Sequence, residues 1–101
     1  MVSFTNRASV PAHVLVRFLE GESVLLNLET ERYFGLDSTG TRMWKAVTAA
    51  PEIEAAYEEL LREYDVDPEL LRTNLTELLG QLQANGLLEV HPADVGKAAA
   101  V

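Results

Sequence analysis

The chain of 101 residues contains no cysteine. Disulfide bonds, thiolate metal sites and thiol catalysis are therefore excluded, and a reducing compartment is permitted. No window of the sequence approaches the ~20 consecutive apolar residues that span a bilayer. The opening stretch MVSFTNRASVPA lacks the charged and then apolar regions of a signal peptide. We therefore expect a cytoplasmic protein with no membrane partner.

Basic residues are scarce, with 8 Lys and Arg against 16 Asp and Glu and a net charge of −8. A nucleic-acid-binding surface needs clustered cations that displace condensed counterions, and no such cluster is present. Nucleic acid is therefore not an expected partner, whereas a basic peptide is a better electrostatic match. The same charge is also explained by solubility alone, with no partner implied.

Groups that perform catalysis are few. His13 and His91 lie far apart in the sequence, and no nearby Asp or Glu marks either as a base. They also lack the spacing of a metal site, and no glycine-rich phosphate-binding motif occurs. We predict that the protein is not an enzyme and carries no cofactor or metal.

Three short strand patterns open the main part of the chain. The segments 13–19 and 23–29 alternate apolar and other residues and are predicted to form an antiparallel hairpin. In the second of these, Val24, Leu26 and Leu28 are expected on one face, the side on which Phe34 and Leu36 of the next strand also lie. The segment 32–36, RYFGL, is predicted as a third strand, with Phe34 and Leu36 facing the core. In a meander this strand lies at the sheet edge, with one row of unpaired backbone groups.

Three helix patterns follow. The sequence DSTG supplies caps for a helix that ends near Ala49, and a second helix is expected between Pro51 and Tyr64. Asp67 and Pro68 are predicted to begin a third helix that ends at Asn85 and Gly86. The expected fold is therefore α+β, a three-stranded antiparallel sheet followed by three helices, like a winged helix-turn-helix. We divide the chain into an N-terminal arm (1–12), one domain (13–90) and a flexible tail (91–101).

The ordered set VLLNLETERYFGLDSTGTRMWKAV, REYDVDPE and a leucine-rich last helix resembles the PqqD-like family over roughly residues 13–90. These are the recognition domains that bind leader peptides of ribosomally made, modified peptides. The length, with no fused catalytic domain, looks most like the stand-alone recognition proteins of lasso-peptide gene clusters. The resemblance implies that the chain binds a precursor's leader peptide. It also implies presentation to a transglutaminase-like cysteine protease and then to an asparagine-synthetase-like cyclase.

In that family the leader adds as a strand to the edge of the third strand and lies against the third helix, which is β-augmentation. Gly35 would let another backbone approach closely, and Tyr33 and Phe34 would wall the pockets. The flank of the third helix that meets the peptide is left open between Asn74 and Leu79, with the Asn74 side favoured, and acidic rim residues are expected to attract leader lysines. The predicted site consists of Glu31, Arg32, Tyr33, Phe34, Gly35, Leu36, Asp67, Glu69, Leu71, Asn74, Leu75 and Leu78.

Three other functions remain open on this sequence. A PqqD-like protein also fits a peptide chaperone for a radical-SAM enzyme. The element order fits a winged-helix DNA-binding regulator, although the third helix has Arg72 as its only cation and carries Glu69 and Glu77. The third is a structural subunit that docks on an enzyme.

Overall fold

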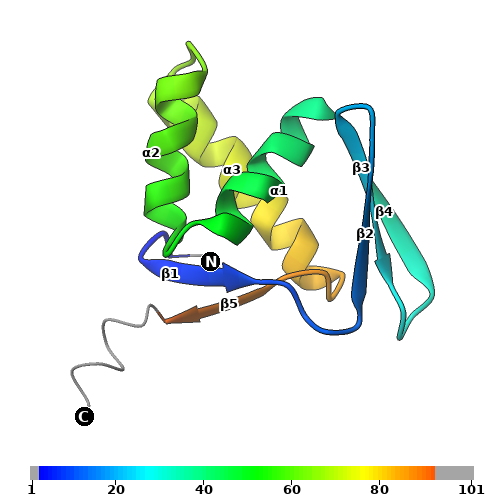
Figure 1. Ribbon diagram of the computed structural model, residues 1–101. Helices are drawn as coiled ribbons and strands as arrows, with labels where there is room; N and C mark the ends of the chain where they lie inside the picture. Colours follow the sequence, from blue (N-terminus) through cyan, green and yellow to red (C-terminus); the bar gives the residue numbers. More distant parts are fainter. Residues whose placement is uncertain (1–2, 93–101) are drawn as a thin grey trace.

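A computed structural model describes residues 3–92 of the chain. Three helices lie beside a three-stranded sheet, and a separate two-stranded sheet runs beneath them (Figure 1). In chain order the elements are β1 (Asn6–Ser9), β2 (Val14–Leu19), β3 (Glu22–Asn27), β4 (Arg32–Leu36), α1 (Ser38–Ala49), α2 (Ile53–Glu63), α3 (Pro68–Ala84) and β5 (Glu89–Pro92). The predicted α+β class, with an antiparallel sheet and three helices, is confirmed.

The larger sheet is an antiparallel meander with strand order β2-β3-β4. Glu20 and Gly21 form the turn between β2 and β3, and both have positive φ, at 50° and 87°. Such a turn matches the right-handed twist of the two strands that it joins. Because β4 is last in the order, one of its edges is unpaired within the sheet, as the sequence predicted.

Local capping explains where the helices begin and end. The Asp37 side chain accepts from the Gly40 N–H at 2.8 Å and caps α1, and the Asp67 side chain caps α3 through the Glu69 N–H at 2.8 Å. Gly86 follows α3 with φ of +70°, where glycine is favoured. These predicted caps are confirmed. Within residues 3–92, none of the helices has the length and apolar character that a bilayer crossing requires.

The core lies between the helices and the inner face of the β2-β3-β4 sheet. Helix α1 packs between this sheet and α2 (Figure 1). Trp44 of α1 is buried, as predicted, and α3 contributes a continuous stripe of buried leucines. The fully enclosed side chains include Leu25, Val47, Ile53, Leu60, Leu75, Leu79, Leu82 and Leu87.

The two ends of the described chain differ from their predicted roles. The segment 1–12 was expected to be an arm, but it carries β1, which pairs antiparallel with β5 from Asn6 opposite Pro92 to Ser9 opposite Glu89. Phe4 and Ala8 are buried, and the rings of Phe4 and Tyr57 pack in a T-shaped arrangement with their centroids 5.5 Å apart. His91 also belongs to β5 and not to a tail. The rest of the predicted tail, 93–101, lies outside the described residues.

The buried face of β3 also differs from the prediction. Ser23, Leu25 and Asn27 are buried, whereas Val24 and Leu26 lie on the opposite, outer face of the sheet. Because β3 carries apolar residues on both faces, alternation along the strand does not identify which face is the inner one. Phe34 of β4 pairs with the buried Leu25 and therefore lies on the inner face of the sheet, as predicted.

Candidate peptide-binding edge and groove

The backbone of β4 directs alternate residues toward its open edge. The Leu28 N–H donates to the His13 carbonyl at 2.8 Å, so these two opposite residues form a hydrogen-bonded pair. Hydrogen-bonded pairs alternate along antiparallel strands, so the next ones between β2 and β3 are Leu15 with Leu26 and Arg17 with Val24. Residues 23, 25 and 27 of β3 therefore turn their backbone groups toward β4. Their partners Leu36, Phe34 and Arg32 turn theirs back toward β3. It follows that Tyr33 and Gly35 present N–H and C=O groups to the open edge.

Helix α3 has one occupied flank and one accessible flank. On the occupied side the Arg72 guanidinium lies 4.4 Å from the ring centroids of Phe4 and Tyr57 and 3.5 Å from the Glu54 carboxylate. Leu79 is fully buried, whereas Asn74 is exposed. Of the two flanks that the sequence left open, only the Asn74 side is accessible.

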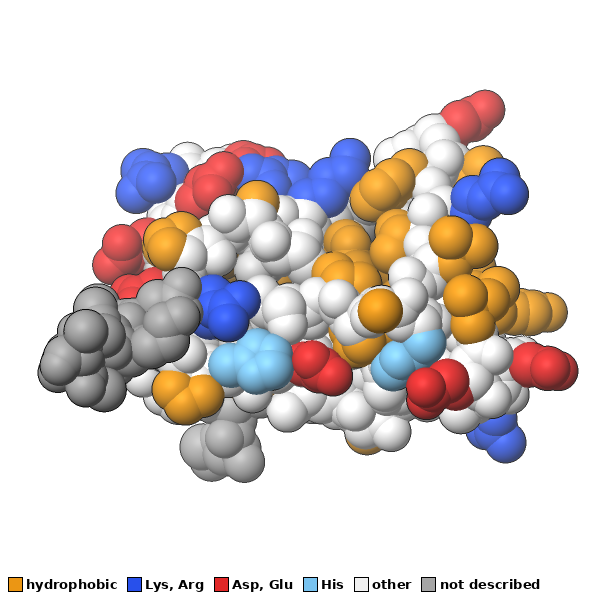
Figure 2. Space-filling model, turned by 60° about the horizontal axis from the view of Figure 1, so that its bottom comes forward, with side chains coloured by type: hydrophobic (Ala, Val, Ile, Leu, Met, Phe, Trp, Pro, Cys, Tyr) orange, Lys and Arg blue, Asp and Glu red, His pale blue; other side chains and the backbone are white. Residues whose placement is uncertain are grey.

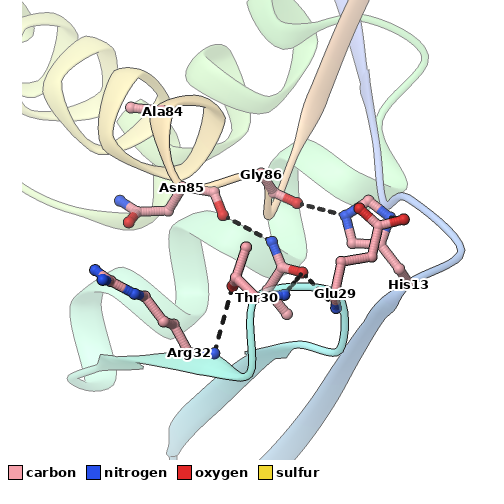
Figure 3. Close-up of a pocket in the computed structure, with 8 residues that line it drawn as sticks. His13, Glu29, Thr30, Arg32, Ala84, Asn85 and Gly86 are labelled. Atoms are coloured by element: carbon pink, nitrogen blue, oxygen red, sulfur yellow. Dashed lines mark hydrogen bonds and ion pairs between the residues drawn. The ribbon is translucent and has the colours of Figure 1, made fainter.

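The first residue of β4 and the last turn of α3 enclose a polar hollow of about 720 Å³ (Figure 3). The buried Asn27 side chain spans it: its amide nitrogen donates to the Asn85 carbonyl at 3.0 Å, and its oxygen accepts from the Glu29 N–H at 2.9 Å. The hollow is lined by His13, Asn27, Glu29, Thr30, Arg32, Ala84, Asn85 and Gly86. We call it the polar pocket.

A second hollow, of about 170 Å³, lies at the opposite end of α3, just past the end of β4. Its lining is mostly apolar and comes from the start of α1, the end of α2 and the first turns of α3. The residues are Thr39, Met43, Tyr64, Val66, Leu70, Leu71 and Asn74. We call it the apolar pocket. A strand laid along β4 would therefore have a polar pocket near one end and an apolar pocket near the other.

The predicted site residues on β4 point to both faces of the sheet. Phe34 is half-buried against the core and Leu36 is buried, which agrees with core packing as their main role. Tyr33 is 76% exposed and projects onto the outer face, so its ring does not face α3. Tyr33 and Phe34 therefore cannot wall one common pocket, because successive strand residues point to opposite faces.

On α3, the predicted residues divide between the surface and the core. Leu71 and Asn74 line the apolar pocket, Leu78 is half-buried, and Leu75 is fully buried beneath them. The sequence did not identify Thr39 and Met43 as lining residues, since both belong to α1. It also missed Asn27 and Asn85 at the polar pocket, because nothing local in the sequence indicates that these two asparagines meet.

The predicted rim charges have distinct local roles. Asp67 is engaged as the N-cap of α3, and Glu69 is exposed in the first turn of that helix. Glu31 is exposed at the turn before β4 with φ of 62°. Only Asp67 and Glu69 lie close in sequence to apolar-pocket residues, namely Val66 and Leu70. Within residues 3–92, no three His, Asp or Glu side chains gather as a metal-binding group.

An ion-pair network joins α1 to α2 beside the apolar pocket. Arg42 donates to the Glu63 carboxylate through Nε and Nη2, at 2.8 and 2.7 Å, and to Glu59 through Nη2 at 2.8 Å. These hydrogen bonds from Arg42 hold the pKa of the Glu63 carboxyl below its ordinary value. The hydrogen bond to Glu63 likewise raises the pKa of the Arg42 guanidinium. The network fixes the α1–α2 contact from which Met43 and Tyr64 line the pocket.

Comparison with known proteins gives one family and two solved structures. A family model described as coenzyme PQQ synthesis protein D (PqqD) matches residues 22–88. TbiB1 in complex with the TbiA(beta) leader peptide aligns at 32% identity with a TM-score of 0.72, covering 80% of this chain and 94% of TbiB1. Lasso peptide synthetase B1 complexed with the leader peptide aligns at 19% identity with a TM-score of 0.71, covering 82% and 98%; this likeness concerns the fold. No curated protein matches the chain.

Proposed function

This chain belongs to the PqqD family, and on that premise we propose that it is a non-catalytic adaptor for the leader peptide of a ribosomally made precursor. The precursor is of the lasso-peptide kind. The observation that carries the proposal is the open edge of β4, where the backbone groups of Tyr33 and Gly35 face outward beside the accessible flank of α3. TbiB1, which is 32% identical to this chain, has been solved with a leader peptide bound, and this supports the proposal.

In this account the leader forms a fourth strand next to β4. Main-chain hydrogen bonds to Tyr33 and Gly35 set its register, and side-chain pockets supply the specificity. The apolar pocket beside Asn74 accepts an apolar leader side chain, and the polar pocket beside Arg32 accepts a polar one. Asp67 and Glu69 act as rim charges, which alter the association rate and its salt dependence more than the lifetime of the complex.

The chemistry is supplied by separate enzymes in this proposal. The adaptor holds the leader while a transglutaminase-like cysteine protease removes it, and an asparagine-synthetase-like cyclase then closes the ring. The chain brings no cysteine for such a reaction. A DNA-binding role is disfavoured because Arg72, the cation of α3, is stacked on Phe4 and Tyr57 and paired with Glu54.

Fluorescence polarisation tests the proposal with a labelled synthetic peptide that has the leader sequence of the precursor encoded beside this chain's gene. Tyr33→Pro removes an edge N–H, whereas Tyr33→Ala removes the exposed ring and keeps the N–H. We expect Tyr33→Pro to bind about tenfold more weakly than Tyr33→Ala, because one hydrogen bond is lost and a peptide carbonyl is left unpaired. Equal affinities of the two variants, or tight binding of duplex DNA with none of the leader, would overturn the proposal.

A further inference from the structure

The outer face of the β2-β3-β4 sheet is apolar and has a hollow at the β4 edge. Hydrophobic side chains gather on the side of the molecule that this sheet forms (Figure 2, right). Leu15, Leu19 and Tyr33 of this face are 46%, 60% and 76% exposed. The hollow has a volume of about 290 Å³ and is lined by Leu19, Glu22, Ser23, Val24, Gly35, Leu36 and Asp37.

Gly35 makes this hollow. A Cβ built at Gly35 meets no atom within 4 Å, so the glycine is not required by packing and leaves open space above the sheet. Gly35 pairs with Val24 on β3, and Leu19 of β2 lines the same hollow, so the floor of the hollow is apolar. Because Gly35 turns its backbone groups to the open edge, a strand added to β4 places one residue directly opposite it.

That opposite residue must project onto the same outer face, because paired residues of antiparallel strands share a face. With no side chain on Gly35, a long side chain from the added strand can lie across it toward Val24. The far end of the hollow carries two carboxylates, Glu22 and Asp37. Asp37 uses one oxygen to cap α1, at 2.8 Å from the Gly40 nitrogen. Arg17 of β2 pairs with Val24, which in turn pairs with Gly35, so this cation lies two strands away from the open edge of β4.

We propose that the leader residue paired with Gly35 is a lysine or arginine, whose apolar stem crosses Gly35 and whose cationic head lies beside Asp37 and Glu22. This inference rests on the proposed function and names the chemistry of one leader position. An apolar stem with a charged end matches a hollow with an apolar floor and an acidic end. The net charge of −8 favours the same choice over an acidic side chain.

A positional scan of the labelled leader peptide tests the inference. Each leader position is replaced in turn by Lys, Ala, Phe and Glu, and the affinities are measured for the unchanged protein and for Glu22→Gln/Asp37→Asn. Asn at position 37 retains the cap of α1 because asparagine caps as well as aspartate does. We expect one position at which Lys binds about twofold to fivefold more tightly than Ala, within the range of partly exposed ion pairs. In Glu22→Gln/Asp37→Asn the preference for Lys over Ala should disappear at that position and at no other.

Two further variants make the result specific. Gly35→Val fills the hollow, so the peptides with Lys and with Ala at that position should bind this variant with equal affinity. Glu22→Lys should reverse the preference, so that Glu at the same position binds more tightly than Lys. Binding that is insensitive to the charge at every position, or strongest with Phe opposite Gly35, would overturn this inference and leave the proposed function intact. Absence of binding by every peptide would overturn both.

Discussion

The side-chain amide of Asn27 donates a 3.0 Å hydrogen bond to the backbone carbonyl of Asn85, joining the end of β3 to the end of α3. The Asn27 oxygen also accepts from the backbone N–H groups of Glu29 and Thr30, at 2.9 and 3.3 Å. One buried side chain therefore holds the turn that leads into β4 and the helix end that faces it. The polar pocket has its shape because of this residue.

We predict that Asn27→Ala lowers the free energy of unfolding by about 2 kcal/mol, because the Asn85 carbonyl and two turn N–H groups lose a buried partner. The melting temperature should fall by roughly 10 °C for a domain of this size, as measured by circular dichroism. Asn85→Ala is the matched control, since it keeps the bond from Asn27 to the Asn85 backbone and loses only the exposed bond from the Asn85 amide to the Gln81 carbonyl. Equal melting temperatures for Asn27→Ala and the unchanged protein would show that the bridge contributes nothing.

Replacement by alanine should change the stability of the fold in opposite directions at Gly80, inside α3, and at Gly86, just after it. Gly86 has φ of +70°, and a Cβ there would lie 2.8 Å from the Asn27 amide nitrogen, so Gly86→Ala should destabilise the fold by ~1–3 kcal/mol. Gly80 is exposed inside the helix with open space around its Cβ position, so Gly80→Ala should stabilise it by ~1 kcal/mol. Urea denaturation of the pair measures both changes. A stabilised Gly86→Ala protein would contradict the geometry described for this turn.

The Arg42–Glu63 pair predicts a specific dependence of stability on pH. The pKa of Glu63 is lowered in the folded protein, so its contribution is present above the ordinary pKa of 4.5 and is lost as the pH falls through the folded value. The melting temperature of the unchanged protein should therefore exceed that of Glu63→Gln at pH 7, and the difference should shrink below pH 4.5. Because both side chains are partly exposed, the difference should be small and reduced by salt. A difference that grows on acidification would contradict the assigned hydrogen bond.

Local signals were sufficient to predict the helices and the edge strand. The caps Asp37 and Asp67 act within three residues of themselves, so sequence alone places the starts of α1 and α3. Alternation along 32–36 also placed Tyr33 and Phe34 on opposite faces, as the pairing shows. These features depend on neighbouring residues and not on the rest of the fold.

Features that depend on distant partners were not predictable. Strand β1 is short, and its partner β5 comes from the other end of the chain, so neither shows a clear pattern by itself. Asn27 and Ser23 are polar yet buried, because Asn85 and Thr41 supply hydrogen-bond partners from separate elements. The polar pocket arises from such long-range contacts, and no spacing within the sequence encodes it.

The central claim is that a leader peptide pairs with the open edge of β4, and amide hydrogen exchange measured by NMR tests it most directly. In the free protein the Tyr33 and Gly35 amides should exchange rapidly, because they face solvent, while the Phe34 amide is protected by its pairing with β3. Addition of the leader peptide should slow exchange at Tyr33 and Gly35 and leave Phe34 protected as before. Unchanged exchange at Tyr33 and Gly35, with new protection on β2 or α2, would contradict the account.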